Sequence, residues 1–159
     1  MKGITELCFY THSVGAVFEP LLWRDFDMLT VADIMTRTVQ MVDRTHTVAD
    51  AIVQMQTHGL RSLIVERSSE SMPYGILTDQ DIVYKVMARG LAPDRVRVQD
   101  VMRQTCVFLE PHLPLKEAAL IMADSAVHRA PVVQEGELLG IVSVNDLVTK
   151  GYAMASALA

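Results

Sequence analysis

The apolar residues of the chain fall into short runs that alternate between strand-like and helix-like spacing. Residues 38–42 form a first β-prone run. Thr47 follows as a helix-capping residue, and after it come apolar residues at helical spacing, namely Val48, Ala51, Ile52 and Met55. This part of the pattern predicts a strand followed by an amphipathic helix.

Two further apolar runs, at residues 62–65 and 74–77, flank a polar stretch and have the length of hairpin strands. A second amphipathic segment begins at Thr78 or Asp79, both of which are good helix caps, and Gly90 should end it. Up to this point the chain therefore predicts the order strand, helix, strand, strand, helix.

The same order of elements recurs in the second half of the chain. A β-prone run at about residues 106–109 precedes a helical pattern at 115–124. Strand-like runs follow at 130–134 and 138–142, and a helix should begin at Ser143. The chain thus contains two β-α-β-β-α units.

Direct self-similarity between the halves supports a duplication. Matched residues lie 67 positions apart at the start of the repeats, and we expect this separation to become 68 and then 65 through small length changes in loops. The matched segments are 31–35 with 98–102, 48–51 with 115–118, 59–65 with 127–133, and 75–81 with 140–146.

The predicted fold class is α/β (α+β). A unit of about 60 residues is only marginally stable alone. Helices on one face of a short sheet leave the other face bare, so the two repeats should pack sheet to sheet with pseudo-twofold symmetry. We expect an extension at 1–28, repeats at 29–92 and 93–151, and a tail at 152–159.

Composition narrows the classes of function. The net charge of -5 and the pI near 5.4 give no basic field that would hold nucleic acid. Cys8 and Cys106 lie far apart and in no metal-ligand spacing, so we expect neither a disulfide nor a metal site. No apolar run approaches the roughly 18 residues of a membrane span. We therefore expect a cytoplasmic protein that does not enter the membrane.

Each repeat carries the motif Gly-Ile-Φ-(Thr/Ser)-x-x-Asp, where a buried strand runs into a helix. Its polar residues are Thr78 and Asp81 in the first copy and Ser143 and Asp146 in the second. One interpretation is helix capping alone. In the other, the carboxylates face the groove and accept hydrogen bonds from the vicinal hydroxyls of a ribose, beside exposed amides at the helix start. Repetition favours the second interpretation without excluding the first.

Basic residues stand directly before the central strand of each repeat. They are Arg61 in the first copy and the pair His128 and Arg129 in the second. Arginine can hold a phosphate through two parallel hydrogen bonds. The alternative is that these are ordinary solvated charges.

The duplicated order, the segment Asp33-Ile34-Met35-Thr36 and the run at 128–133 resemble paired CBS motifs, a Bateman module, over about residues 29–151. The resemblance implies one or two clefts that bind adenosyl ligands, with walls formed by Ile64, Ile76, Pro131 and Ile141. The nucleotide-binding residues it implies are Thr38, Arg61, Thr78, Gln80, Asp81, Thr105, His128, Arg129, Pro131, Ser143, Asn145 and Asp146.

We favour AMP or ADP over ATP, because in this alignment Leu60 stands where the second repeat has His128, and fewer cations hold fewer phosphates. Mg²⁺ is expected only together with ATP. S-adenosylmethionine and NAD are alternative ligands. The two clefts should differ in affinity, and the one beside His128 and Arg129 should bind phosphate more firmly.

The chain carries no sequence motif for a catalytic nucleophile, a metal-assisted hydrolase or a phosphate loop, so we expect no enzyme. We expect a homodimer that signals nucleotide occupancy to an unidentified partner protein. The alternative is a structural oligomerisation or scaffold protein with vestigial clefts. The aromatic residues within 1–28 fit either a lid on the core or on a second subunit, or a docking segment.

Overall fold

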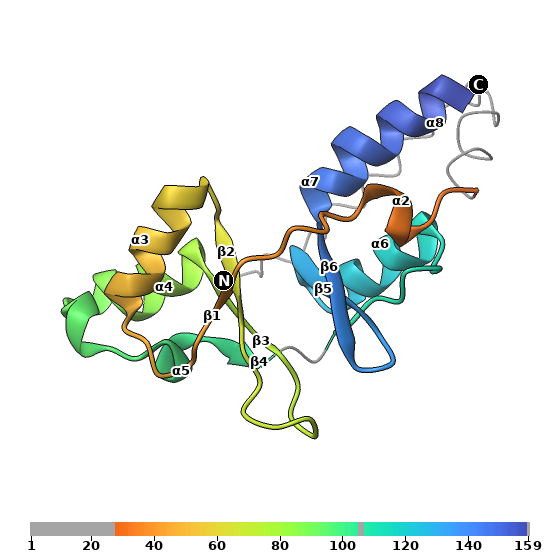
Figure 1. Cartoon of the computed structure of the whole chain (residues 1–159). Helices are drawn as coiled ribbons and strands as arrows, with labels where there is room; N and C mark the ends of the chain where they lie inside the picture. The colour runs from red at the N-terminus through yellow and green to blue at the C-terminus, as the bar shows by residue number, and fades with distance from the viewer. Residues whose placement is uncertain (1–27, 105–106, 159) are drawn as a thin grey trace, which may run out of the picture.

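Two small β-sheets organise the molecule, one in each of two lobes (Figure 1). The computed structural model describes residues 28–104 and 107–158. Strands β1 and β2 are parallel, and the other neighbours are antiparallel. The first sheet has the order β1 (Met41–Val42), β2 (Ser62–Val65), β3 (Gly75–Thr78) and β4 (Arg103–Gln104), and the second pairs β5 (Arg129–Gln134) with β6 (Glu137–Ser143).

The long helix of each repeat buries residues at equivalent positions. The helices are α3 (Val48–His58) and α6 (Leu115–Asp124). Their spacing places the buried side chains on one helix face. The buried residues are Val48, Ala51 and Met55 in α3 and Leu115, Ala118 and Met122 in α6.

The second helix of each repeat begins at the duplicated motif. In the first repeat α4 (Asp79–Lys85) leads into a 3₁₀ turn (Met87–Arg89), and Gly90 ends it with φ 64°, as the sequence predicted. In the second repeat the helix runs through α7 (Val144–Asp146), a π-helical turn (Leu147–Gly151) and α8 (Tyr152–Leu158).

Each hydrophobic core is completed by the segment that precedes the first strand of the other repeat. We call these two segments, residues 31–36 and 98–103, the lead-ins. The short helix α2 (Val31–Ile34) packs with Leu109 and Leu115 in the second lobe. Helix α5 (Val98–Val101) packs with Val48 in the first lobe. Figure 1 shows the chain leaving α2 beside β6 and crossing to β1 in the other lobe. The two lobes are therefore interlocked by exchanged segments.

Glycine in the duplicated motif permits this crossing. A Cβ atom on Gly140 would lie 2.8 Å from the carbonyl oxygen of Thr36 and 2.9 Å from Sδ of Met35. A Cβ atom on Gly75 would lie 2.7 Å from Sδ of Met102. The lead-in of one repeat thus passes directly over the strand of the other, where a side chain would collide with it.

Strand register corrects one part of the sequence alignment. Ser62 pairs with Thr78, and Arg129 pairs with Ser143 at the same place in the second hairpin. Arg129 therefore corresponds to Ser62, and the expected separation of 68 between residues 59–65 and 127–133 is wrong. The separation stays at 67, which makes His128 the counterpart of Arg61. The basic residues had been matched by type, whereas the backbone ladder fixes the true correspondence.

The predicted first strand of the second repeat is present only as a short bridge. Leu109 pairs in parallel with Val132, its N–H donates to the carbonyl oxygen of Pro131, and Cys106 lies outside the described residues. The two β-α-β-β-α repeats confirm the predicted fold class. Within the described part of the chain, no helix combines the length and apolar character needed to cross a membrane.

Candidate functional site

Both copies of the motif form reciprocal helix caps. In the first copy, the N–H and hydroxyl of Thr78 donate to Oδ2 of Asp81 at 3.2 and 2.6 Å, and the Asp81 N–H donates back to the Thr78 hydroxyl at 3.2 Å. Ser143 and Asp146 repeat this arrangement. The capping interpretation is confirmed, and capping occupies only one oxygen of each carboxylate.

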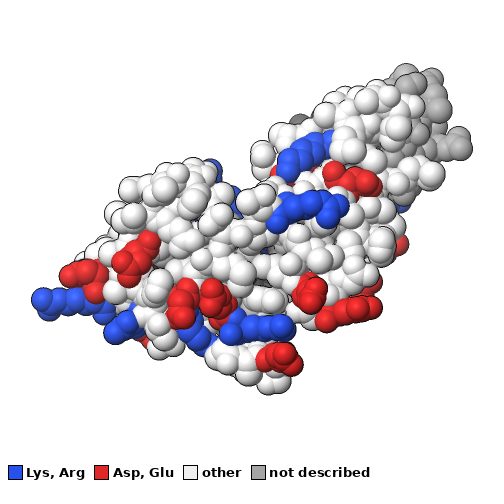
Figure 2. All heavy atoms as spheres, in the orientation of Figure 1, with Lys and Arg blue, Asp and Glu red and all other residues white. Residues whose placement is uncertain are grey.

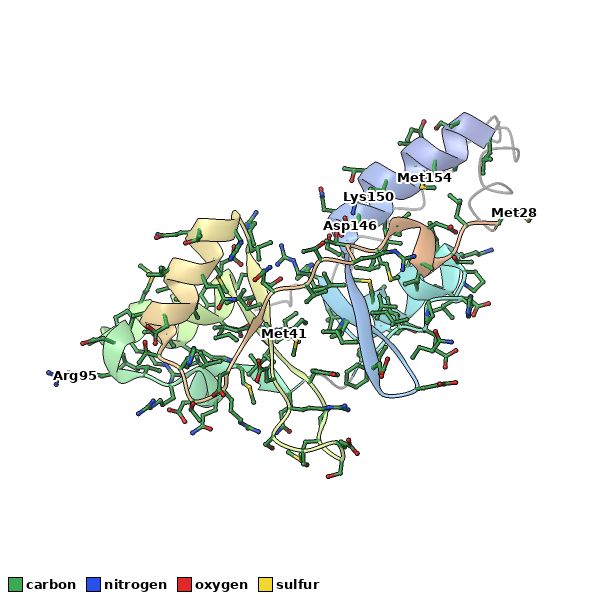
Figure 3. All side chains as sticks on the ribbon, in the orientation of Figure 1. Met28, Met41, Arg95, Asp146, Lys150 and Met154 are labelled. Carbon is green, nitrogen blue, oxygen red and sulfur yellow. The ribbon has the colours of Figure 1, made fainter. Side chains whose placement is uncertain are left out.

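A lysine one turn later engages the other carboxylate oxygen. Lys85 Nζ lies 3.0 Å from Asp81 Oδ1, and Lys150 Nζ lies 2.7 Å from Asp146 Oδ1 (Figure 3). Neither lysine was among the predicted site residues, although the spacing Asp-x-x-x-Lys recurs in the two repeats. An i, i+4 pair of opposite charge on a helix was the available signal.

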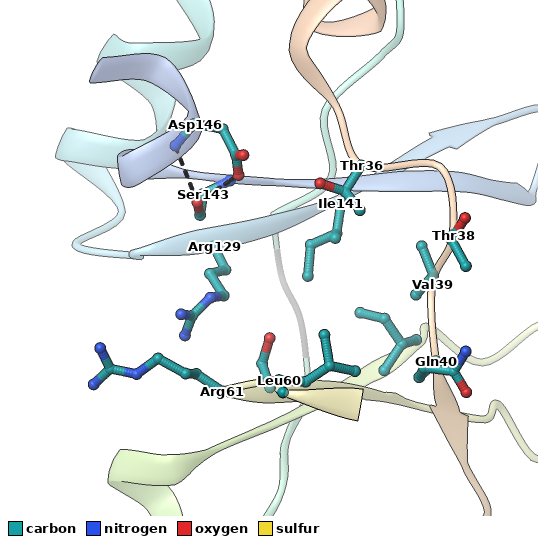
Figure 4. A pocket seen from close by; sticks show the side chains of 13 residues that line it. Thr36, Thr38, Val39, Gln40, Leu60, Arg61, Arg129, Ile141, Ser143 and Asp146 are labelled. Carbon is teal, nitrogen blue, oxygen red and sulfur yellow. Dashed lines mark hydrogen bonds between the residues drawn. The ribbon is translucent and has the colours of Figure 1, made fainter. Parts of the chain in front are cut away.

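A first pocket, which we call the Asp146 pocket, lies between the two lobes and has a volume of about 210 Å³. Figure 4 shows Asp146, Arg129 and Arg61 on one side and the extended segment with Thr38 and Gln40 on the other. The complete lining is Thr36, Thr38, Val39, Gln40, Gly59, Leu60, Arg61, Ser62, Ile64, Arg129, Ile141, Ser143 and Asp146.

A second pocket, the His128 pocket, has a volume of about 230 Å³ and adjoins the first through shared residues. Its lining is Arg61, Ile76, Thr78, Asp79, Gln80, Arg103, Val127, His128, Arg129, Ser143, Val144 and Asn145. The shared residues are Arg61, Arg129 and Ser143. The two pockets therefore draw on the same pair of guanidinium groups.

The guanidinium groups of Arg61 and Arg129 project into the same part of the Asp146 pocket (Figure 4). Arg61 Nε is 2.8 Å from Oδ2 of Asp79, but the Arg61 side chain is 75% exposed, so water screens this pair. Among the described residues, no carboxylate lies within ion-pairing distance of Arg129. The positive charge of Arg129 is thus left for an anionic group.

The two motif carboxylates differ in exposure. The Asp146 side chain is 15% exposed and lines its pocket, whereas the Asp81 side chain is fully buried. Burial raises the pKa of both carboxyl groups, but hydrogen bonds outweigh it and hold each pKa below its usual value. The donors are Thr78, Arg103 and Lys85 for Asp81, and Lys150 and Ser143 for Asp146. Both groups are therefore ionised at neutral pH.

The structure gathers most of the predicted binding residues at these two pockets. Thr38 lines the Asp146 pocket, and Thr78, Gln80, His128 and Asn145 line the His128 pocket. Asp81 and Pro131 are buried and line neither, and Thr105 lies outside the described residues. Of the expected apolar walls, Ile64 and Ile141 line the first pocket and Ile76 lines the second.

Several lining residues escaped the sequence analysis. They include Thr36 and Gln40 in the first pocket and Asp79 and Arg103 in the second. Arg103 follows α5 and enters the site because this segment, which precedes the second repeat, packs on the first lobe and pairs with β3. Within the described residues, no cluster of three or more histidine, cysteine or acidic side chains is arranged to hold a metal ion.

A family model for the CBS domain matches residues 31–88 and again residues 98–151. The chain belongs to the CBS-domain family. CBS-domain proteins of this kind are generally non-catalytic regulatory modules. The two matches coincide with the two repeats that form the pockets.

Relatives extend this assignment. The CBS domain-containing protein YhcV of Bacillus subtilis is 31% identical over 82% of this chain and 91% of its own length. An uncharacterized protein of Methanopyrus kandleri is 31% identical over 76% of this chain. The match covers 61% of the length of that protein. A hexameric CBS-CP12 protein from bloom-forming cyanobacteria is structurally similar, with a TM-score of 0.74 and 44% identity over 77% of this chain and 71% of that one.

Proposed function

We propose that this CBS protein is a non-catalytic sensor that binds an adenosyl ligand in the Asp146 pocket and signals its occupancy to a partner protein. The proposal rests on the convergence of one partly exposed carboxylate, Asp146, with the guanidinium groups of Arg61 and Arg129 in a single pocket. A ribose diol can donate to the carboxylate, and a phosphate can accept from the guanidinium groups.

Each part of such a ligand would meet lining residues of suitable chemistry. The ribose hydroxyls would donate to Asp146, and the phosphate would accept hydrogen bonds from Arg129 and Arg61. The extended segment at Thr38 and Gln40 would face the edge of the adenine ring. Ile141 supplies an apolar surface for the ring between these polar groups.

AMP and ADP fit better than ATP. The reason first drawn from Leu60 is wrong, because strand register matches Arg61 with His128. The preference rests instead on charge: among the described residues, the lining of the pocket has two guanidinium groups and no lysine, and Arg61 is shared with Asp79. Two guanidinium groups suit a short phosphate chain.

Lys150 offers a route from occupancy to signal. Its ammonium group lies 2.7 Å from Asp146 Oδ1 and donates to the carbonyl oxygen of Ile34 and the hydroxyl of Thr36, each at 3.1 Å. One hydroxyl of a ribose would take the open acceptor site of Asp146, and the second would compete with this ammonium group for Oδ1. Weaker contacts to Ile34 and Thr36 would then loosen the lead-in segment that joins the two lobes, and a partner could sense that change.

Isothermal titration with AMP, ADP, ATP, S-adenosylmethionine and NAD tests the proposal. Asp146→Asn should weaken AMP binding by tenfold or more, because a hydrogen bond to a charged group contributes about 1.5–3 kcal/mol. Asp50→Asn is the matched control, since Asp50 forms the same kind of cap with Thr47 on α3 and lines neither pocket. Absence of binding by every ligand, or equal loss in both variants, would contradict the proposed function.

A scaffold role is the second candidate, favoured by exposed apolar side chains at equivalent places on the second helices. Val83 and Val148 are 44% and 65% exposed, and Met87 and Tyr152 are 63% and 61% exposed. Such residues favour self-association of the chain, as a homodimer or a larger ring. Light scattering of wild type and of a Val148→Lys, Tyr152→Lys variant, with and without AMP, separates a ligand-linked assembly from a purely structural one.

A further inference from the structure

The two pockets are built from equivalent residues. Thr36 pairs with Ile141, and Arg103 pairs with Ile76, at corresponding places in the two lobes. Thr36 lines the Asp146 pocket, and Arg103 lines the His128 pocket. The motif carboxylates break this equivalence, because Asp146 lines its pocket and Asp81 does not.

The lysines do not cause this difference, since each bonds to its motif carboxylate and to a backbone carbonyl in the same way. Lys85 Nζ bonds to Asp81 and to the carbonyl oxygen of Val101, and Lys150 Nζ bonds to Asp146 and to the carbonyl oxygen of Ile34. What differs is the residue at the end of the lead-in. Arg103 Nε donates to Asp81 Oδ1 at 2.7 Å, whereas the Thr36 hydroxyl contacts Lys150.

The number of hydrogen-bond donors on each carboxylate shows how Arg103 changes the site at Asp81. Asp81 accepts four hydrogen bonds, two on Oδ2 from Thr78 and one each on Oδ1 from Lys85 and Arg103. A carboxylate has about four lone-pair sites, so Asp81 is saturated. Among the described residues, Asp146 accepts only three, two from Ser143 and one from Lys150. One acceptor site of Asp146 is therefore open to a ligand hydroxyl.

We infer that Arg103 closes the sugar site at Asp81, so that each chain binds a single ribose diol, at Asp146. The pair Thr36 and Arg103 thereby sets the ligand stoichiometry of the module. This inference deepens the proposed function and rests on it. It replaces two equivalent nucleotide sites with one sugar-binding site and a neighbouring pocket that the motif carboxylate Asp81 does not line.

Exchange of the two residues tests the inference by titration calorimetry with AMP. Wild type should bind one AMP per chain, Arg103→Thr should bind two, and Thr36→Arg should bind none. In Arg103→Thr, the further change Asp81→Asn should return the stoichiometry to one. The analogue 2′,3′-dideoxy-AMP should bind at least tenfold more weakly at both sites of Arg103→Thr, because it lacks the diol. Arg103→Met, which keeps the side chain as far as the position of Nε and removes the donor and the charge, guards against a folding defect of the threonine variant.

The outcomes separate this inference from the proposed function. Two AMP per wild-type chain, or one AMP in both Arg103 variants with intact thermal melting, would overturn the role of Arg103 and leave the sensor function standing. No binding by wild type overturns the proposed site at Asp146. In that case binding by Arg103→Thr alone would still support closure of the Asp81 site, and no binding by either protein would overturn both.

Discussion

Lys150 and Ile34 lie at opposite ends of the two repeats in sequence, yet the Lys150 ammonium group donates a hydrogen bond of 3.1 Å to the Ile34 carbonyl oxygen. The same ammonium group pairs with Asp146 in the candidate site. One side chain thus links the pocket to the lead-in helix α2, which completes the hydrophobic core of the second lobe. Lys85 makes the equivalent contact with Val101 in the other lobe, at 2.6 Å.

Replacement of Lys150 by methionine should mimic ligand occupancy. Methionine keeps the apolar length of the side chain and removes both the ion pair and the bond to Ile34. Amide hydrogen exchange in residues 31–36 should then rise several-fold, and AMP should produce a similar rise in wild type but little further change in the variant. Lys116→Met, on the exposed face of α6, is the control. Equal protection of residues 31–36 in all three proteins would contradict this route of signalling.

Acid stability should depend on Asp81. Its pKa is lowered in the folded state, so its stabilising contribution is complete above the unfolded value of about 4 and is lost as pH falls through the folded pKa. Asp81→Asn should cost about 2 kcal/mol at pH 7, a figure kept modest because Lys85 and Arg103 are partly exposed. Urea unfolding from pH 7 to pH 2.5 should show the two proteins converging in acid. Parallel curves would rule out this role.

The elements and the carboxylate motif were accessible from the sequence, because hydrophobic spacing and capping residues are local signals. The sequence did not show that only one of the two motif carboxylates, Asp146, has an open acceptor site. The cause of this difference is Arg103, which reaches Asp81 because the segment before the second repeat stays on the first lobe and pairs with β3. The match of Arg61 with Arg129 failed for a related reason. Side-chain chemistry suggested it, whereas the hydrogen-bond ladder places Ser62 opposite Thr78 just as it places Arg129 opposite Ser143.

The crossing itself predicts unequal costs for alanine at the two motif glycines. At Gly140 the added methyl group would meet the backbone oxygen of Thr36 at 2.8 Å, which can move only with the main chain. At Gly75 the nearest atom is the flexible Sδ of Met102, at 2.7 Å. Gly140→Ala should therefore lower the free energy of unfolding by about 3 kcal/mol and Gly75→Ala by about 1 kcal/mol. Chemical denaturation measures both, and equal costs would show that the methionine does not yield.

Ala126 stands where the first repeat has Gly59, and replacing it with glycine should stabilise the protein. Helix α3 is followed by Gly59 with φ 62°, and α6 is followed by Ala126 with φ 51°. In both cases the next residue donates a backbone hydrogen bond to the helix: Leu60 N–H to the carbonyl oxygen of Met55, and Val127 N–H to that of Met122. A left-handed conformation costs a residue with a Cβ about 1–2 kcal/mol. Glycine at this place avoids that strain.

Ala126→Gly should therefore raise the free energy of unfolding by about 0.5 kcal/mol, since the greater freedom of glycine in the unfolded chain offsets part of the relief. Gly59→Ala should lower it by about 1 kcal/mol. The second change tests the backbone alone, because no atom lies within 4 Å of the position that a Cβ on Gly59 would take. Thermal and urea unfolding should give opposite signs for the two variants. A loss of stability in Ala126→Gly would mean that the end of α6 is held by its neighbours and gains nothing from the relief of its φ angle.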